Sequence, residues 1–307
     1  MLSTQPSYLK LSEAEFEERI AKLYGILKDC TLCARECKVD RTAGERGFCR
    51  PGMEPSVSSF FPHFGEEPPL RGSHGSGTVF LAGCNLRCIY CQNWELSHLD
   101  AGDHMTEEEL ARAMLRLQHL GCHNINFVTP THFAPQLVKA VKLAAEQGLR
   151  IPIVWNCGGY ESVEVIKLLE GIVDIYMPDI KYGDESSAKR YSAAPNYFDV
   201  AKAAVEEMHR QVGDLVVEGG IAVKGLLIRH LVLPNRLAGS EEVLRFIATL
   251  SRNSYVNIMD QYHPCYKAFD YPELSRRITQ EEYDEVIELA HDLGLHRGFP
   301  ERRALFR

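Results

Sequence analysis

Residues 78–93 read TVFLAGCNLRCIYCQN, so an apolar run leads directly into three closely spaced cysteines. The run 78–82 predicts a short buried strand. Cys84, Cys88 and Cys91 then follow with the spacing Cys-x3-Cys-x2-Cys. Three thiolates at this spacing can bind three irons of a 4Fe–4S cluster, which leaves the fourth iron free to bind a small molecule. Gly83 has no side chain, so the backbone can approach such a cluster closely.

From residue 78 onward, short apolar runs alternate with amphipathic stretches. The runs predict strands at 78–82, 124–129, 151–156, 172–177, 225–232 and 255–259. The stretches predict helices at 107–120, 135–148, 161–170, 197–212 and 241–252, and a last one that ends near Gly294. This alternation indicates a parallel sheet with crossover helices. Six units are too few for a closed eight-stranded barrel, so we expect an α/β fold with an open, partial barrel or a doubly wound sheet. In both, chemistry lies at the carboxyl ends of the strands.

Composition excludes several classes of protein. The chain has 307 residues, of which 45% are apolar and 25% charged, as in ordinary globular proteins. Its formal net charge of −8 argues against a nucleic-acid partner. There is no apolar run long enough to span a membrane, and the first twenty residues lack the apolar core of a signal peptide, so we expect a cytoplasmic protein. Its ten cysteines therefore point to metal ligation or catalysis rather than to disulfides.

Four cysteines near the N-terminus form a second group, with the spacing Cys-x2-Cys-x3-Cys-x11-Cys: Cys30, Cys33, Cys37 and Cys49. Four thiolates can close a tetrahedral zinc site or hold a 4Fe–4S cluster, and the spacing does not choose between them. The site would be structural or would relay electrons.

The sequence predicts a boundary near residue 75 between an N-terminal segment and a larger domain. Ser12 and Glu15 form a capping box that predicts a helix over 13–28. Residues 30–75 show no sustained period and are expected to be loops held by metal, including a connecting loop at 62–69. We therefore expect an N-terminal helix and four-cysteine segment in 1–75 and a barrel in 76–307.

The three-cysteine motif after the first strand of a βα-repeat domain resembles that of the radical S-adenosylmethionine (SAM) superfamily. Within it the chain is similar to an uncharacterised branch that resembles pyruvate formate-lyase activating enzymes. The stretch HFGEEPPLRGSHGSGTVFLAGCNLRCIYCQN, residues 63–93, the cysteine-rich start and the later strand ends carry the resemblance.

The resemblance implies a six-unit partial TIM barrel and a defined chemistry. The open iron of the cluster would chelate the amino and carboxylate groups of SAM. The reduced cluster would cleave SAM to methionine and a 5′-deoxyadenosyl radical, which abstracts a hydrogen atom. The resemblance also implies a reductant such as flavodoxin or ferredoxin, and the exposed cluster implies an anaerobic or microaerobic setting.

Several strand ends match SAM-binding positions of the family. Tyr90 matches the position whose backbone contacts the adenine, and Arg229 matches an arginine that holds the SAM carboxylate. Asp179 and Lys181 keep an Asp-x-Lys signature, although alternation on a strand also fits a simple ion pair. His263, in Gln-Tyr-His at 261–263, resembles a histidine near the SAM nucleoside, but a hydrogen-bonded core histidine is the alternative.

Two strand ends depart from the activating enzymes. Those enzymes have Gly-Gly-Glu after the second strand, where the SAM amino group binds, whereas residues 129–132 read Thr-Pro-Thr-His. The oxygens of Thr129 and Thr131 can accept from an ammonium, but no carboxylate is present. After the third strand, Asp-Thr-Asn-Gly is replaced by Trp-Asn-Cys-Gly at 155–158, which keeps Asn156 as a candidate SAM contact but loses the acid. These departures argue against a straightforward activator of glycyl-radical enzymes.

Three cysteines stand alone: Cys122, Cys157 and Cys265. Cys122 precedes the second strand and is expected to be a buried, inert thiol. Cys157 and Cys265 follow strand ends at the expected active-site mouth. A thiol there could donate or relay a hydrogen atom to a substrate radical, with simple packing as the alternative.

The sequence therefore predicts a radical SAM enzyme of oxidoreductase type. Its substrate would be a glycine on a glycyl-radical enzyme, or else another protein, a peptide or a small molecule. The alternative is a non-enzymatic electron-transfer or metal-binding protein with iron–sulfur or zinc sites. That alternative predicts a fully ligated cluster and no SAM binding.

Overall fold

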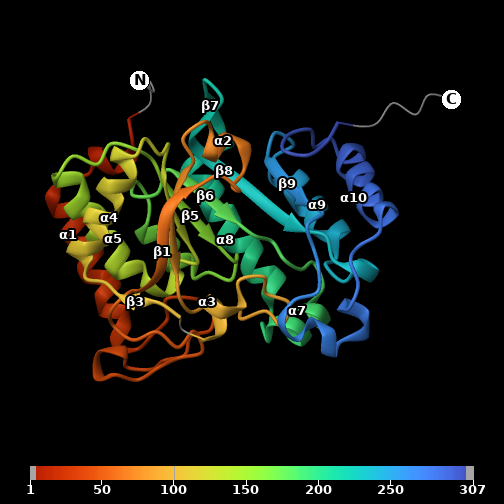
Figure 1. The fold of residues 1–307 in the computed structure, drawn as a ribbon, viewed down its shortest axis with the longest axis horizontal. Coiled ribbons are helices and arrows are strands. Elements are labelled where there is room, and N and C mark those ends of the chain that lie inside the picture. Colours follow the sequence, from red (N-terminus) through yellow and green to blue (C-terminus); the bar gives the residue numbers. More distant parts are fainter. Residues whose placement is uncertain (1–4, 100, 302–307) are drawn as a thin grey trace.

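The computed structural model describes residues 5–99 and 101–301. In this part of the chain, six parallel strands follow one another across a single curved sheet (Figure 1). They are β2 (Ser76–Leu81), β4 (Ile125–Val128), β5 (Ile153–Cys157), β6 (Ile175–Pro178), β8 (Ile221–Leu231) and β9 (Tyr255–Met259). Each coincides with a predicted strand to within a few residues. The sheet does not close on itself, so the α/β fold is an open, partial barrel.

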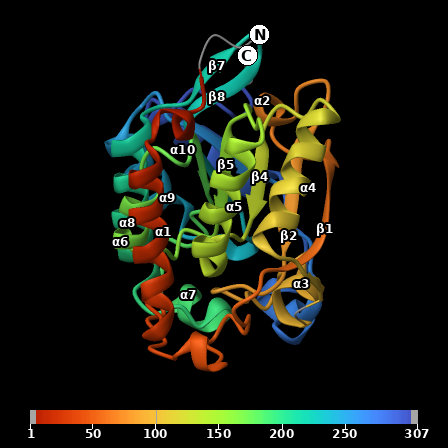
Figure 2. The same ribbon diagram turned by 90° about the vertical axis from the view of Figure 1, so that its left-hand side faces the viewer.

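Helices cover the outside of this sheet. Those longer than eight residues are α1 (Glu13–Gly25), α4 (Glu107–His119), α5 (Ala134–Glu146), α8 (Tyr197–Val212), α9 (Ser240–Leu250) and α10 (Gln280–Asp292). The shorter ones are α2 (Pro68–Arg71), α3 (Trp94–Leu99), α6 (Val163–Leu168) and α7 (Glu185–Ser192). Figure 2 shows α1, α4 and α5 side by side in front of the sheet. The described helices include none that is long and apolar enough to cross a membrane.

Three antiparallel strands flank the parallel ones: β1 (Ser56–His63), β3 (Asp103–His104) and β7 (Val216–Glu218). β1 pairs with β2 along most of its length, so the expectation of loops throughout 30–75 was wrong. Its sequence SVSSFFPH mixes polar residues with a proline and gives no clear alternation. The division of the chain at residue 75 stays a prediction, and β1 lies in the same sheet as the barrel strands.

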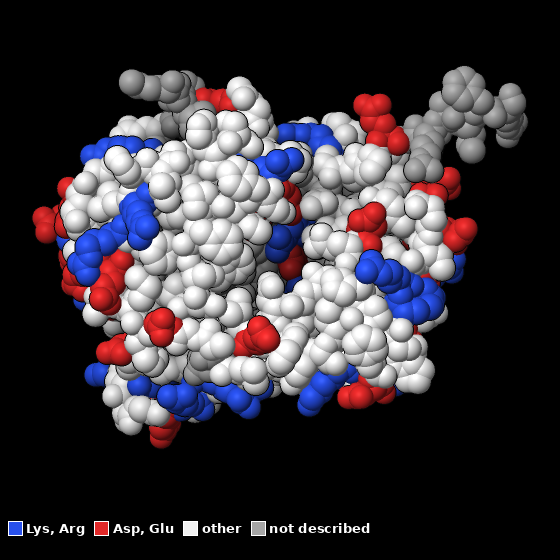
Figure 3. Space-filling view, viewed as in Figure 1, with Lys and Arg blue, Asp and Glu red and all other residues white. Residues whose placement is uncertain are grey.

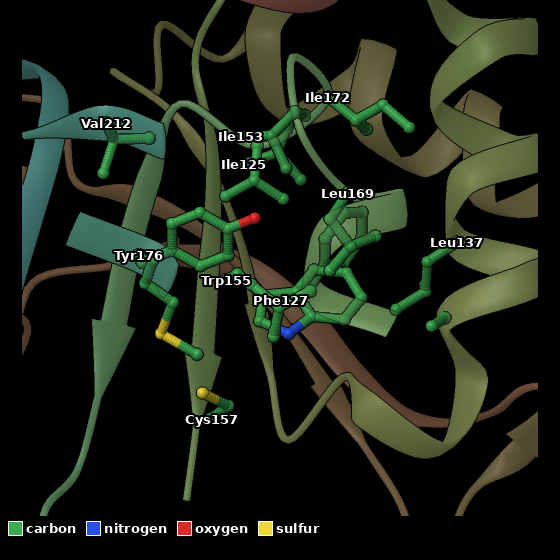
Figure 4. Packing of buried hydrophobic residues seen from close by; sticks show 14 of the residues in the cluster. Ile125, Phe127, Leu137, Ile153, Trp155, Cys157, Leu169, Ile172, Tyr176 and Val212 are labelled. Carbon is green, nitrogen blue, oxygen red and sulfur yellow. The ribbon is translucent and has the colours of Figure 1, made fainter. Parts of the chain in front are cut away.

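The core lies between the sheet and its outer helices. Phe127, Trp155 and Tyr176, on three neighbouring parallel strands, are buried there (Figure 4). Leu137 of α5 points toward them from the helix side. Because these strands are apolar on both faces, they fit the interior of a layered α/β fold. Cys157 lies at the end of β5, where the core meets the carboxyl edge of the sheet.

The sheet is open between β9 and the edge formed by β1 and β2. Figure 3 shows a hollow on this face, with charged atoms of both signs inside it. The segment before α2 crosses the opening: the Asn257 amide on β9 donates to Glu67 Oε1 at 2.9 Å. One side-chain contact therefore joins the two ends of the open sheet.

Candidate active site

A cavity of about 230 Å³ lies at the carboxyl ends of the parallel strands. Most of the residues that the sequence singled out line it: Cys84, Cys88, Tyr90, Cys91, Thr129, Asn156, Cys157, Asp179, Lys181 and Arg229. These residues come from the loop after β2 and from the ends of β4, β5, β6 and β8. Strand topology thus brings together predicted side chains that are up to 145 positions apart, from Cys84 to Arg229.

The three loop cysteines face this cavity together. Each sulfur accepts a hydrogen bond: Cys84 from the backbone of Leu86 at 3.3 Å, Cys88 from Ser192 at 2.9 Å, and Cys91 from Ser97 at 3.3 Å. The pKa of Cys84 is raised to about 12, mainly by burial and also by the neighbouring Cys88. This cysteine would therefore become a thiolate only on binding a metal. Three sulfur ligands around one cavity, each with a hydrogen-bond donor, fit the 4Fe–4S cluster of the sequence prediction.

Asp179 is the centre of an ion-pair network in the cavity wall. Its Oδ2 lies 2.6 Å from Lys181 Nζ and its Oδ1 lies 2.7 Å from Arg229 Nε. Arg229 also donates to Asn156 Oδ1 at 2.9 Å. Burial raises the pKa of Asp179, but the two cations outweigh it, so the net pKa lies below its usual range. The ion pair foreseen for Asp179 and Lys181 is present, and it faces the cavity.

Sequence reasoning missed Glu66 and Glu67, which approach the same arginine from the segment before α2. Arg229 Nη1 lies 3.6 Å from Glu67 Oε1 and 3.9 Å from Glu66 Oε2. Both glutamate side chains are more than nine-tenths buried. The net pKa of Glu66 is raised to about 8. Burial is the largest cause, the Arg229 guanidinium partly offsets it, and the neighbouring Glu67 adds to the rise. The signal was two adjacent acids in an otherwise apolar, proline-containing stretch.

The end of β4 is organised by a second acid that the sequence analysis missed. Thr129 lines the cavity with φ of +58°, whereas Thr131 is buried and donates to Glu161 Oε2 at 2.7 Å. Burial raises the pKa of Glu161 to about 7, and the neighbouring side chains of Thr131, Cys157 and Asn85 partly offset this rise. A carboxylate therefore lies behind the strand end where the sequence showed none, although it comes from another loop.

Besides Thr131, two further predicted residues lie outside the cavity lining. His263 Nδ1 is 3.3 Å from the amide nitrogen of Gln92, which does line it. Cys265 is partly exposed and precedes a short 3₁₀ helix. Tyr90 lines the cavity while its ring packs edge-on against Tyr182. The roles assigned to these side chains stay predictions.

The N-terminal cysteines gather in a segment, residues 30–52, that lies at the same end of the molecule as α3 and α7 (Figures 1 and 2). The net pKa of Cys49 is raised to about 12. Burial is the largest cause, the Arg41 guanidinium partly offsets it, and Cys30 and Cys37 add to the rise. Cys33 interacts electrostatically with Cys49 and Cys37 as well. Cys49 therefore lies within electrostatic range of the other three thiols.

A metal at these four cysteines stays a prediction. Within residues 5–99 and 101–301, no three His, Cys, Asp or Glu side chains are close enough to hold a single metal ion. A 4Fe–4S cluster binds each thiolate to a different iron, so its ligands stand farther apart than those of one ion.

The segment contacts the loop of Cys84, Cys88 and Cys91 directly. Arg35 Nε donates to the carbonyl of Asn85 at 2.8 Å. A Cβ on Gly83 would come within 2.7 Å of the Cys49 carbonyl oxygen, and Gly83 has φ of +84°. A side chain at Gly83 is excluded on both grounds.

Comparisons with known proteins agree with this geometry. A family model described as the radical SAM superfamily matches residues 78–232. An uncharacterized protein of Methanocaldococcus jannaschii is 37% identical over 298 residues, which is 94% of this chain and 81% of that protein. The pyruvate formate-lyase-activating enzyme of Clostridium pasteurianum is 30% identical over 181 residues, which is 57% of this chain and 68% of that enzyme.

Among solved structures, the chain is similar to HydG, a maturase of the FeFe-hydrogenase, with a TM-score of 0.52. The sequences are 12% identical, and the match covers 73% of this chain and 52% of that one. The chain therefore spans about half the length of that protein, and the likeness is one of fold.

Proposed function

The chain belongs to the radical SAM superfamily, whose members cleave SAM with a 4Fe–4S cluster, and we propose that this enzyme abstracts a hydrogen atom from a protein, peptide or small-molecule substrate. The observation that carries the proposal is the meeting of Cys84, Cys88 and Cys91 with the network around Asp179 in one cavity. When bound, the cluster supplies the electron that cleaves SAM.

The cavity residues would divide the binding of this cofactor among themselves. The three loop cysteines would hold the cluster, and Arg229, fixed by Asp179 and Asn156, would hold the SAM carboxylate. The oxygen of Thr129 would accept from the SAM ammonium. His263, which lies next to Gln92, would contact the nucleoside of SAM.

The substrate would enter through the opening between β9 and the edge of β1 and β2. Activation of a glycyl-radical enzyme is one candidate, supported by the similarity to the Clostridium pasteurianum enzyme. The departures at 129–132 and 155–158 favour a different protein, peptide or small molecule. Mass spectrometry of candidate glycyl-radical partners after incubation with the enzyme and SAM distinguishes the two.

We propose a second metal site at the four N-terminal cysteines and a one-electron donor as partner. Radical SAM enzymes generally use a reductant such as flavodoxin or ferredoxin, and either would supply the electron here. Whether the second metal is zinc or iron is decided by counting both metals in the purified chain.

Cys157 and Cys265 are proposed hydrogen-atom donors or relays. Replacing each with Ala should leave SAM cleavage without substrate intact and should abolish the final product. Cys157 is the stronger candidate because it lines the cavity, and burial raises its pKa and keeps the transferable S–H hydrogen in place. Full-rate product from the Cys157→Ala variant would exclude this role.

The central test is anaerobic. The purified chain is reconstituted with iron and sulfide, mixed with SAM and dithionite, and assayed for 5′-deoxyadenosine and for iron and zinc. We expect deoxyadenosine from the wild type and from Cys122→Ala, a matched substitution of a buried cysteine outside the cavity lining. We expect none from Cys88→Ala.

Absence of deoxyadenosine from a protein with a full cluster would reject the proposal and favour an electron-transfer protein. About eight irons per chain would indicate two clusters. About four irons with one zinc would indicate one cluster and a zinc site.

A further inference from the structure

A chain of two hydroxyl groups ends on one of the cluster cysteines. Ser192 Oγ donates to Cys88 Sγ at 2.9 Å, and Tyr182 Oη lies 2.7 Å from Ser192 Oγ. All three residues are buried, with exposed fractions between 0% and 6%.

The direction of this chain follows from the hydrogens available. A serine hydroxyl has one hydrogen, and Ser192 uses it on the sulfur of Cys88. Tyr182 must then donate to Ser192. Because the serine hydroxyl is polarised by the tyrosine hydroxyl behind it, the bond to the sulfur is stronger than that of an isolated serine.

Backbone contacts fix Ser192 in this position. It is the last residue of α7, and the neighbouring Tyr191 carbonyl accepts from the backbone of Ile89, next to Cys88, at 2.9 Å. The Arg35 guanidinium donates to the Ser192 carbonyl at 2.8 Å. The backbone of Ser192 is therefore held against two other segments, the loop of Cys88 and the N-terminal cysteine segment.

Hydrogen bonds to cluster sulfurs are one of the levers that set the reduction potential of an iron–sulfur cluster. One-electron reduction adds a negative charge to the cluster, and a buried donor stabilises the reduced state more than the oxidised state. We infer that Ser192, polarised by Tyr182, is a positioning residue that raises the reduction potential of the cluster at Cys88. The inference rests on the proposed function only in that Cys88 is an iron ligand.

The test is a potentiometric titration of the full chain, reconstituted anaerobically without SAM and followed by electron paramagnetic resonance. The signal to follow is the one lost when Cys84, Cys88 and Cys91 are all replaced with Ala. In Ser192→Ala we expect the ratio of reduced to oxidised cluster at a fixed potential to fall about tenfold, which is about 59 mV for one electron. Tyr182→Phe should shift it in the same direction by less.

Ser187→Ala is the matched control, because Ser187 is a buried serine of the same helix that contacts Asp184 instead. The Ser187→Ala variant should keep the wild-type midpoint potential. The Ser192→Thr variant keeps a hydroxyl, so its midpoint potential should return most of the way to the wild-type value. An unchanged midpoint in Ser192→Ala with wild-type iron content would overturn the inference.

If Ser192→Ala fails to bind iron, Tyr182→Phe decides, and an unchanged midpoint there overturns the inference. A wild type that assembles the cluster and cleaves SAM upholds the proposed function in either case, so the two failures are distinguishable.

Discussion

Asp179 illustrates what single residues contribute to this site. The Asp-x-Lys spacing was enough to place Asp179 and Lys181 on one face of a strand end, and the structure puts their charged atoms 2.6 Å apart. The approach of Glu66 and Glu67 to Arg229 was not predictable, because it depends on a loop more than 150 positions away in sequence. Local spacing predicted the pair, and tertiary packing supplied the rest.

Replacing Asp179 with Asn should lower the free energy of unfolding by about 3 kcal/mol, because it leaves two largely buried cations without their shared carboxylate. Urea denaturation measures the loss. Asp199→Asn is the control, since Asp199 pairs with Lys202 at the surface and should cost well under 1 kcal/mol. Equal losses in the two variants would contradict the reading of the network.

The same network predicts a pH dependence. The pKa of Asp179 is lowered by folding, so its stabilising contribution is fully present above the pKa of about 3.9 that it has when unfolded. The contribution disappears as the pH falls through the lower folded value. The difference in unfolding free energy between wild type and Asp179→Asn should therefore be constant from about pH 5 to pH 7, below the pKa of Glu66 of about 8, and should shrink in more acidic buffer.

At the scale of elements, helix starts were the most predictable feature. The capping box predicted at Ser12 forms, and the same pattern, a threonine with a glutamate three positions later, forms capping boxes at Thr106 and Thr279. The six parallel strands were equally predictable from the sequence, because buried strands are apolar on both faces. β1 was missed, since an edge-type strand with polar residues and a proline carries little pattern. α7, which supplies Ser192, is short and polar and was missed for the same reason.

Thr106→Ala should cost about 1 kcal/mol of stability, because the hydroxyl caps the Glu109 amide at 3.2 Å at the start of α4. Thermal denaturation detects this loss. Thr249→Ala, within α9, removes a threonine that only bonds back to the carbonyl of Arg245. It should change stability by less than about 0.5 kcal/mol. A loss there as large as in Thr106→Ala would count against the capping interpretation.

At the scale of the whole molecule, a buried arginine joins the barrel to the N-terminal cysteine segment. The sequence predicted the two parts but gave no sign of what connects them. Arg41 is 1% exposed, and its guanidinium donates to the carbonyls of His132, at 2.6 Å, and Gly52. One side chain thus connects the cysteine segment to the loop after β4.

Arg41→Met should free this segment while the barrel stays folded. Two hydrogen bonds from a charged donor are lost, so we expect proteolytic cleavage within 30–52 to accelerate about tenfold, equivalent to about 1.4 kcal/mol. Limited proteolysis with mass spectrometry locates the cut. Arg112→Met, at an exposed position of α4, is the control. Cleavage spread evenly over the chain would indicate global unfolding instead.

The contact between Glu67 and Asn257 joins residues 190 positions apart, and its consequence is kinetic. Such a contact encloses nearly the whole barrel in one loop, so it can form only after the six repeats have assembled. It belongs to the last step of folding and the first step of unfolding. Asn257→Ala should therefore accelerate unfolding in stopped-flow experiments while refolding keeps its rate. The contact between Glu67 and Asn257 would then set the lifetime of the native state. Slower refolding in this variant would instead place the contact in the folding nucleus.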